Sequence, residues 1–375
     1  MTKNLDKYWL AFASIEKIGS VFIKTLYEHF GSIEQAWHAH IEDLHQIETL
    51  TRRQINDFIE CKKNVNPDKC LEIILNKNIK YLNYTNEKYP QLLKEIYNPP
   101  MTLFYKGNLD RCNFNRTLAV VGSRKASEAA KTVLTKIISG FKGTDICIVS
   151  GLALGIDSCA HKAAINNKIS TIGVIASGFD FIYPTQNKDL YKKIEDEAGV
   201  IFSEYWPTFQ PLQWRFPHRN RIVTGLSKGT LVAEAAMKSG ALISANLCLE
   251  QNRELMCMPG LLTNPNTEGI YKLIKNGAAV ITRPEDILET LNWQIEKQES
   301  TIGRNPESYI DELDLDETEQ KVFISIATEA KNFDNILLET ELDFGDLMVV
   351  LTNLEIKGYI KQTDGEKYMS VINVC

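Results

Sequence analysis

Seven short apolar runs, most of them rich in β-branched residues, recur along the middle of the chain and constrain its fold most strongly. They read LAVVG, ICIVSG, TIGVIAS, VIFSEY, TLVAEA, LMCMPG and AAVIT, and helical stretches separate them. Strands buried on both faces have this near-continuous apolar character, and strand-helix alternation is typical of a parallel sheet covered by helices. The sequence therefore predicts an α/β fold with a doubly wound, mostly parallel sheet.

The segment before these runs has a different pattern. Between residues 1 and 75 apolar positions recur at helical spacing, and Gly31 and Ser32 mark a helix stop and restart. The stretch IEKIGSVFIKTLYEHFG resembles the first half of a helix-hairpin-helix (HhH) or sterile-alpha-motif (SAM) module, in which a glycine turn can meet a DNA phosphate. Because the second half lacks the matching glycine, we predict a helical domain that serves packing or protein contact.

The rest of the chain divides by composition. Residues 76–292 are predicted to form the sheet domain, which opens with a proline-punctuated stretch and one more strand around MTLFYKG. Residues 293–315 are polar and acidic, as expected for a linker. Residues 316–375 contain helical stretches followed by a hairpin that turns at Asp364-Gly365, an order typical of a winged helix.

Overall composition sets broad limits. With 375 residues, of which 44% are hydrophobic, the chain can bury a core in two or three domains. No run approaches the roughly 18 apolar residues of a membrane-spanning helix, and the N-terminus lacks a signal-peptide pattern, so a cytoplasmic protein is expected. The eight cysteines never form CxxC, which predicts reduced thiols and neither a disulfide framework nor a zinc site.

Loops that follow the strands carry the first candidate binding residues, because ligands of such sheets bind beyond the carboxyl ends of the strands. After LAVVG, Gly122 would let a phosphate approach the backbone, Ser123 has a hydroxyl to donate, and Arg124 has the geometry for a bidentate pair with phosphate oxygens. Ser127 is a plausible N-cap of the helix that follows. After ICIV, the corresponding residues are Ser150 and Gly151.

Neither loop contains GxGxxG or a P-loop, which disfavours a dinucleotide site and an ATPase. The alternative is that the glycines only allow tight strand-to-helix turns. Asp157 and His161 stand four apart, a spacing that suits an acid/base pair but is more typical of a helix-terminal contact or a core histidine. No nucleophile-and-base set and no metal-ligand spacing is visible, so we predict no catalytic residue, no metal and no cofactor.

The stretch RFPHRNRIVTGLS concentrates cations at the same edge of the sheet, although the net charge of the chain is -6. Arg215, Arg219 and Arg221 are expected to neutralise phosphates, and Phe216 offers a ring on which a base can stack. Such a combination suits a single strand, whose bases are free to stack. The alternative is a solvated cationic helix start with Phe216 in the core.

Two more loops complete this edge. Ser239 and Gly240 precede another helical stretch and are candidate contacts for the same ligand. Glu234 ends an apolar strand, where we expect its carboxylate to receive backbone or arginine hydrogen bonds and to have a structural role.

In this order and spacing, GSRKAS, SGLALGID, IASGFDFIYPTQN, SEY, FPHRNRIVTGLS and SGALISA resemble the DNA-processing protein A family (DprA, also called Smf) over residues 80–290. The resemblance implies an extended Rossmann-like fold and a homodimer that is not an enzyme. It also implies binding and protection of single-stranded DNA, and loading of RecA recombinase in natural transformation. The residues carried over from the motifs are Gly122, Ser123, Arg124, Ser150, Gly151, Phe216, Arg219, Asn220 and Arg221.

The chain departs from the family pattern in two places. The family often has a basic residue shortly before the phenylalanine, where this chain has Gln213 and Trp214. The predicted recognition helix, FGDLMVVLTNLEI, contains Asp346 and Glu355 but no lysine or arginine, whereas a reader of the major groove needs cations or amides at base edges. We therefore interpret the winged helix as a module for protein contact or regulation.

Two other functions remain open on the sequence. The sheet also resembles that of the phosphoribohydrolases called LOG proteins, which carry PGGxGTxxE, but here the stretch is LSKGTLVAE and the spacing to Glu234 is one residue too long. The second alternative is an interaction scaffold that binds no DNA, in which the arginines form buried ion pairs with carboxylates such as Glu204 and Glu234.

Overall fold

The structure is a computed structural model that describes residues 6–294, 315–326, 330–363 and 367–370. Its contacts divide the chain into two compact units, residues 1–295 and 296–375. The hairpin turn predicted at Asp364-Gly365 and most of the predicted linker lie outside the described residues. Within the described residues, no helix is both long and apolar enough to cross a membrane.

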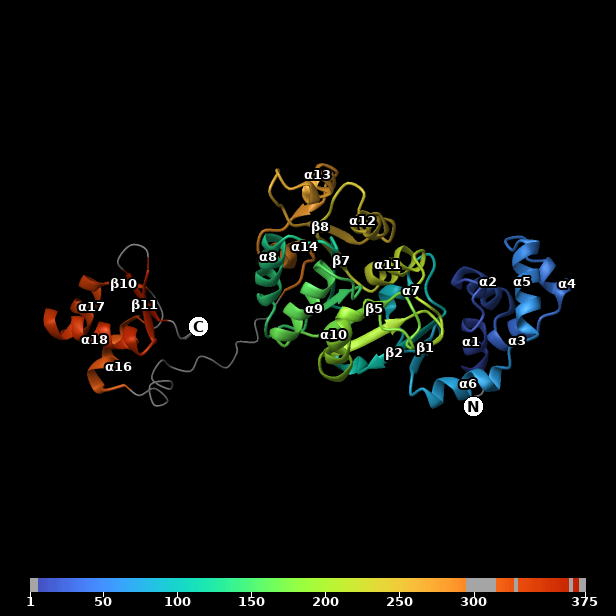
Figure 1. Ribbon diagram of the computed structural model, residues 1–375, viewed down its shortest axis with the longest axis horizontal. Coiled ribbons are helices and arrows are strands. Elements are labelled where there is room, and N and C mark those ends of the chain that lie inside the picture. Colours follow the sequence, from blue (N-terminus) through green and yellow to red (C-terminus); the bar gives the residue numbers. More distant parts are fainter. Residues whose placement is uncertain (1–5, 295–314, 327–329, 364–366, 371–375) are drawn as a thin grey trace. The chain divides into compact units, whose positions relative to one another are not determined.

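The described part of the first unit contains a nine-stranded sheet in the order β1-β2-β6-β5-β4-β3-β7-β8-β9 (Figure 1). β1 pairs antiparallel with β2 and β2 with β6, whereas all other neighbours are parallel. The strands are β1 (Lys80–Asn83), β2 (Thr102–Gly107), β3 (Thr117–Gly122), β4 (Cys147–Ser150), β5 (Thr171–Ile175), β6 (Gly199–Ser203), β7 (Gly229–Glu234), β8 (Glu254–Cys257) and β9 (Ala279–Val280). The seven apolar runs are confirmed as β3 to β9, and the extra strand as β2.

Helices precede the sheet and then alternate with its strands. Those before β1 are α1 (Asp6–Ala13), α2 (Ser20–Phe30), α3 (Ile33–His38), α4 (Ile41–His45), α5 (Arg52–Lys62) and α6 (Pro67–Asn76). Those among the strands are α7 (Gln91–Lys94), α8 (Glu128–Ser139), α9 (Ile156–Asn166), α10 (Lys188–Lys193), α11 (Arg215–Gly225), α12 (Gly240–Glu250), α13 (Glu268–Lys275) and α14 (Pro284–Thr290).

Alternate residues of the strands serve the two faces of the sheet, as the two-residue period of a strand requires. In β3, Leu118 and Val120 pack with α8, α9 and α14, whereas Ala119 and Val121 pack with α7, α11, α12 and α13. Both faces are therefore covered, which confirms the doubly wound α/β fold. Strand order reverses between β3 and β7, so the loops that follow these strands diverge there and leave a crevice.

The N-terminal helices form part of the same compact unit as the sheet. Gly31 ends α2 in the left-handed conformation with φ 68°, and Ser32 precedes α3, as the sequence predicts. One apolar cluster runs from these helices to Phe104 of β2 and Ile201 of β6. The hydroxyl of Thr102 donates to the carbonyl of Trp9 at 3.3 Å, which adds a polar link across this contact.

The second unit has the winged-helix order of elements. It contains α16 (Glu317–Ile326), β10 (Lys331–Asn332), α17 (Phe333–Thr340), α18 (Phe344–Ile356), β11 (Ile360–Thr363) and β12 (Lys367–Ser370). The strands form an antiparallel sheet in the order β10-β12-β11. α18 is the helix that the sequence identifies as lacking lysine and arginine.

Candidate nucleic-acid interface

A hollow of about 630 Å³ opens at the point where the strand order reverses. Its walls come from the loops after β3, β4 and β7 and from α11, so segments far apart in the sequence meet there. Among the predicted residues, the hollow is lined by Gly122, Ser123, Arg124, Gly151, Phe216, Arg219, Asn220, Ser239 and Gly240. The other three, Ser150, Arg215 and Arg221, do not line it.

The loop after β3 is held in a fixed shape by its own backbone. The N–H of Ser123 donates to the carbonyl of Glu234 at 2.8 Å, and the carbonyl of Ser123 accepts from the N–H of Ile156 at 3.1 Å. A Cβ at Gly122 would lie 2.5 Å from the side chain of Ile156, so the strand can end this close to α9 only with glycine. Ser127 caps α8 by accepting from the N–H of Ala130 at 3.2 Å, as predicted.

Arg124 and two aromatic rings form one wall of the hollow. The guanidinium of Arg124 lies 5.3 Å from the centroid of the Phe216 ring, and the centroid of the Tyr183 ring lies 5.5 Å from that of Phe216. Arg124 is exposed, and no carboxylate in the described part of the chain forms an ion pair with it. Phe216 is half-buried and faces the hollow, so it is not a core residue.

The loop after β4 is tied down from both sides. The Asp157 carboxylate accepts from the N–H groups of Gly151 at 3.1 Å and Ala153 at 3.3 Å, which satisfies donors at this turn. Burial raises the pKa of Asp157, while the charge of Arg219 opposes this rise. The Ser150 hydroxyl is fully buried and donates to the carbonyl of Val120 at 2.6 Å, so the structure gives Ser150 a structural role in place of the predicted contact.

Arg219 forms the floor of the hollow. Its guanidinium donates to the carbonyls of Gly151 and Val174, and a Cβ at Gly151 would lie 2.6 Å from it. Burial lowers the pKa of Arg219 to about 10, which still leaves the side chain charged at neutral pH. Only 3% of Arg219 is exposed. We therefore expect it to act on a ligand mainly through the positive potential of its charge and less through direct contact.

Arg215 and Arg221 lie elsewhere, and their predicted contact with phosphates is corrected. Arg215 is fully buried and pairs with Glu16 of the helical segment, while Arg221 is 2% exposed and pairs with Glu204. The guanidinium of Arg221 also donates to the carbonyl of Asn98 at 3.0 Å. Through these contacts the two arginines hold together the loop before β2, the loop after β6 and the helical segment.

The start of α12 also lines the hollow, through Ser239 and Gly240. The Ser239 side chain makes no capping hydrogen bond, and within the described residues its buried Oγ has no hydrogen-bond partner. A Cβ built on Gly240 would meet no atom within 4 Å, so a ligand can approach the backbone at this residue. An unpartnered hydroxyl at the amino end of an 11-residue helix is suited to an anionic group.

Sequence reasoning missed Lys125, Tyr183 and Asn266, which also line the hollow. Lys125 directly follows the glycine-serine-arginine triplet, and Tyr183 lies in the long loop after β5. Both residues therefore belong to motifs that carry the family resemblance, GSRKAS and IASGFDFIYPTQN. No sequence pattern pointed to Asn266, because only the tertiary fold brings the loop after β8, in which it lies, to the hollow.

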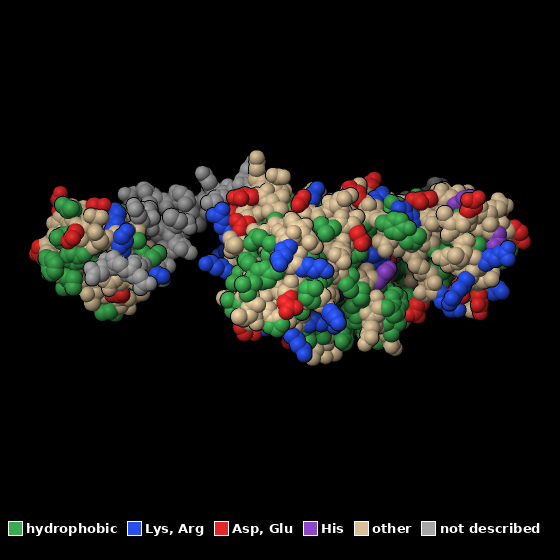
Figure 2. All heavy atoms as spheres, turned by 90° about the horizontal axis from the view of Figure 1, so that it is seen from above, with side chains coloured by type: hydrophobic (Ala, Val, Ile, Leu, Met, Phe, Trp, Pro, Cys, Tyr) green, Lys and Arg blue, Asp and Glu red, His purple; other side chains and the backbone are tan. Residues whose placement is uncertain are grey.

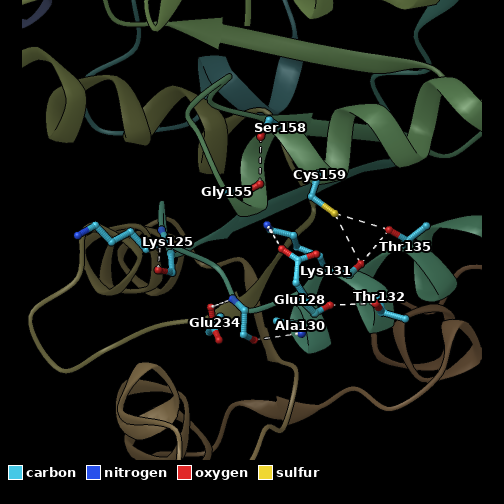
Figure 3. Close-up of polar contacts among 12 residues, drawn as sticks. Lys125, Glu128, Ala130, Lys131, Thr132, Thr135, Gly155, Ser158, Cys159 and Glu234 are labelled. Atoms are coloured by element: carbon cyan, nitrogen blue, oxygen red, sulfur yellow. Dashed lines mark hydrogen bonds and ion pairs between the residues drawn. The ribbon is translucent and has the colours of Figure 1, made fainter. Parts of the chain in front are cut away.

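Glu234 and His161 are not among the residues that line this hollow. The Glu234 carboxylate accepts from the N–H of Ser127 at 3.0 Å and the amide of Asn264 at 2.9 Å at the start of α8 (Figure 3), which confirms its structural role. His161 is fully buried, its Nδ1 lies 2.7 Å from the Thr171 hydroxyl, and burial lowers its pKa to about 3. The sequence interpretation of His161 as a core histidine is therefore confirmed.

Together, the reversed strand order, the rigid loop after β3 and the open start of α12 define a Rossmann-like protein with a hollow at its switch point that arginine and lysine side chains line. Comparison with known families identifies which one. Residues 80–292 match the family described as DNA recombination-mediator protein A, and residues 307–366 match the DprA winged helix domain. The chain belongs to the DNA-processing protein A (DprA/Smf) family.

Individual relatives extend this match. The chain is 34% identical to protein Smf of Synechocystis sp., over 98% of this chain and 99% of that protein. It is 44% identical to DNA processing protein DprA of Streptococcus pneumoniae, over 53% of this chain and 70% of that protein.

Solved structures agree. The X-ray structure of S. pneumoniae DprA matches with a TM-score of 0.66 at 34% identity, over 76% of this chain and 97% of that one. DNA processing protein A of Helicobacter pylori, studied for its single-stranded DNA binding mode, matches with a TM-score of 0.51 at 28% identity, over 57% of this chain and 95% of that one.

Proposed function

We propose that the protein binds single-stranded DNA without sequence preference in the hollow at the switch point and loads RecA recombinase onto it. One observation carries this proposal: the exposed guanidinium of Arg124 lies against the ring of Phe216, in a hollow that the open start of α12 also lines. A cation for a phosphate and a ring for a base stand side by side.

The geometry favours a single strand over a duplex. Bases can stack on Phe216 and Tyr183 only when they are not paired, and stacking contributes roughly 1–3 kcal/mol per base. Stacking and phosphate contacts read no base edges, so sequence preference is not expected. The H. pylori relative, which binds single-stranded DNA, shares this fold at 28% identity and supports the proposal.

The remaining parts of the proposal follow from the family. The family name describes a mediator of DNA recombination, and loading RecA is a role of that kind. We propose that the protein performs this role in the cytoplasm. We propose that it does so as a homodimer, protects the strand during transformation and carries out no chemical step. The buried His161 and the bonded carboxylate of Asp157 support the last point, since neither is free to exchange a proton with a ligand.

The two alternatives explain less. A phosphoribohydrolase of the LOG type needs a carboxylate in its substrate site, but Glu234 is 1% exposed and is not among the residues that line the hollow. A pure scaffold accounts for the buried pair of Arg221 with Glu204 but not for Arg124, which is exposed and forms no ion pair with any described carboxylate.

Fluorescence anisotropy with labelled oligothymidine tests the proposal. We expect Phe216→Ala to weaken binding about 5- to 150-fold, which corresponds to one lost stacking contact. Arg124→Ala is expected to weaken binding roughly tenfold, as for a charged hydrogen bond, and to reduce the slope of log affinity against log salt by about 0.7.

Two variants with exposed side chains elsewhere are matched controls: Arg53→Ala on α5 and Phe344→Ala on α18. They are expected to bind like the wild type, and duplex DNA is expected to compete poorly. Equal binding by the wild type and both hollow variants would contradict the proposal. RecA loading is then measured as the rate of RecA filament formation on oligothymidine with each variant.

A further inference from the structure

A second hollow, of about 360 Å³, lies next to the first, between α8 and α9. Its cationic lining residues are Arg124, Lys125, Lys131 and Lys162, and among the described residues no carboxylate lines it. The single-strand proposal uses only Arg124 from this set. Figure 2 shows lysine and arginine side chains at the end of the sheet-bearing unit that carries α8, and others spread over the rest of that face.

Most of these cations are available to a ligand. In the described part of the chain, Lys125 and Lys162 form no ion pair with a carboxylate. Lys131 pairs with Glu128 at 2.6 Å, one turn earlier on α8, but the Glu128 side chain is 88% exposed. An exposed pair of this kind contributes only about 0–1 kcal/mol, so a phosphate can displace Glu128 at little cost.

Two hydroxyls and the thiol of the second hollow are already engaged in hydrogen bonds (Figure 3). The hydroxyl of Thr135 donates to the carbonyl of Lys131 at 2.8 Å, and that of Ser158 to the carbonyl of Gly155 at 3.1 Å. Cys159 points from α9 toward the same turn of α8. A site for a small molecule needs free directional groups, whereas flexible ammonium groups alone suit a row of phosphates.

The two hollows share one rim, because Arg124 and Lys125 line both. Gly155 belongs to this rim with φ +80°, and a Cβ there would lie 2.2 Å from the carbonyl oxygen of Ser123. Because glycine has no Cβ, the loop after β4 can pack directly on the loop after β3 at this rim. In the part of the chain that the structure describes, no aromatic residue lines the second hollow, so it offers phosphate contacts without base stacking.

From this continuity we infer that a bound single strand continues from the first hollow past Gly155 into the groove between α8 and α9. Lys131 and Lys162 then hold phosphates of nucleotides that flank the stacked ones, and Lys125 contacts the backbone where it crosses the rim. This inference rests on the proposed binding of single-stranded DNA. It adds a second set of phosphate contacts, which only a longer strand can reach.

A length-dependent binding experiment tests the inference. The double variant Lys131→Gln/Lys162→Gln is compared with wild type on oligothymidines of about 6 and about 24 nucleotides, lengths chosen around known site sizes. We expect the affinity for the long strand to fall roughly tenfold and its salt slope to fall by about 1.4, as for two lost phosphate contacts. The affinity for the short strand is expected to stay unchanged.

The matched control is Lys136→Gln/Lys142→Gln, which removes the same charge from two exposed lysines in and just after α8, outside the hollow. Wild-type affinity and slope of the Lys131/Lys162 variant on the long strand would overturn the inference, as would equal losses on both lengths or in the control. If wild type binds neither strand, the proposed function itself fails, which is a different result.

Alkylation of Cys159 gives an independent readout in the unmodified protein, because this half-buried thiol lines the second hollow. Iodoacetamide modification, followed by peptide mass spectrometry, is expected to slow with the long strand and not with the short one. Cys61 on α5 is the internal reference. Equal modification of Cys159 with and without the long strand would overturn the inferred path.

Discussion

At the scale of single residues, burial decides which polar groups of this protein are functional. Arg124 and Arg221 have the same chemistry, yet one is exposed beside an aromatic ring and the other is 2% exposed and paired with Glu204. His161 shows the same effect for a titratable group. It is fully buried and leaves its Nε2 without a hydrogen-bond partner, so the folded protein holds it neutral.

This burial predicts a loss of stability in mild acid. Burial lowers the pKa of His161 to about 3, below its usual value in the unfolded chain, so the unfolded state binds more protons as the pH falls. Stability is therefore highest above pH ~6.5 and is expected to decrease by about 1.4 kcal/mol per pH unit below it. The measurement is urea unfolding between about pH 7.5 and 5.5.

The variant His161→Gln removes the titrating group and is expected to flatten this pH dependence, even if it is less stable throughout. His218 adds a smaller effect of the same sign, because burial and the charge of Arg221 also lower its pKa. The prediction fails if wild type and His161→Gln lose stability equally over this pH range.

At the scale of elements, α11 distributes its cations around the helix. Successive residues turn by about 100°, so Arg219 and Arg221 point in nearly opposite directions. Below the hollow, Arg219 donates hydrogen bonds to the carbonyls of Gly151, just after β4, and of Val174 in β5. Arg221 forms an ion pair with Glu204 and donates to the Ser20 hydroxyl at the start of α2. The helix thus joins the binding edge of the sheet to the helical segment.

The pair of Arg221 with Glu204 is expected to be important for folding and not for DNA contact. Arg221→Ala leaves the Glu204 carboxylate, 13% exposed, without its main partner, and we expect a loss of about 3 kcal/mol in urea unfolding. The double variant Arg221→Met/Glu204→Met is expected to recover most of that loss. Affinity of folded Arg221→Ala for oligothymidine is expected to stay near wild type, and a drop as large as that of Arg124→Ala would contradict this assignment.

At the scale of the whole molecule, charge is distributed so that binding is local. The chain has a net charge of -6, which opposes indiscriminate attraction to polyanions, while cations gather around the two hollows. The winged-helix unit does not share this pattern. Its α18 exposes Phe344, Val349 and Ile356 and carries no lysine or arginine, which suits protein contact.

A negative charge introduced on α18 distinguishes a role of this helix in protein contact from a role in DNA reading. Val349 is 60% exposed, and Val349→Glu would repel a DNA backbone if this helix lay in a groove. We expect its affinity for single-stranded and duplex DNA to stay within about twofold of wild type, since a helix without cations makes few phosphate contacts. A clear loss of duplex binding in the anisotropy assay would instead identify α18 as a DNA reader.

The sequence by itself determined the order of elements and much of the binding edge. The seven parallel strands, the stop at Gly31, the cap at Ser127 and the loop of Gly122 to Arg124 all depend on local patterns: the spacing of apolar residues and the conformations that particular residues favour. These patterns involve residues that are close together in the chain, so they can be read from the sequence alone.

Only the tertiary structure decided which arginines are free. The cluster in RFPHRNR looks uniform in the sequence, but Arg215 and Arg221 meet Glu16 and Glu204, carboxylates from other parts of the chain. The same holds for the second hollow, which forms because α8 and α9 pack side by side on one face of the sheet. Whether a charge is exposed or paired depends on contacts between distant segments, and these exist only once the sheet has brought the segments together.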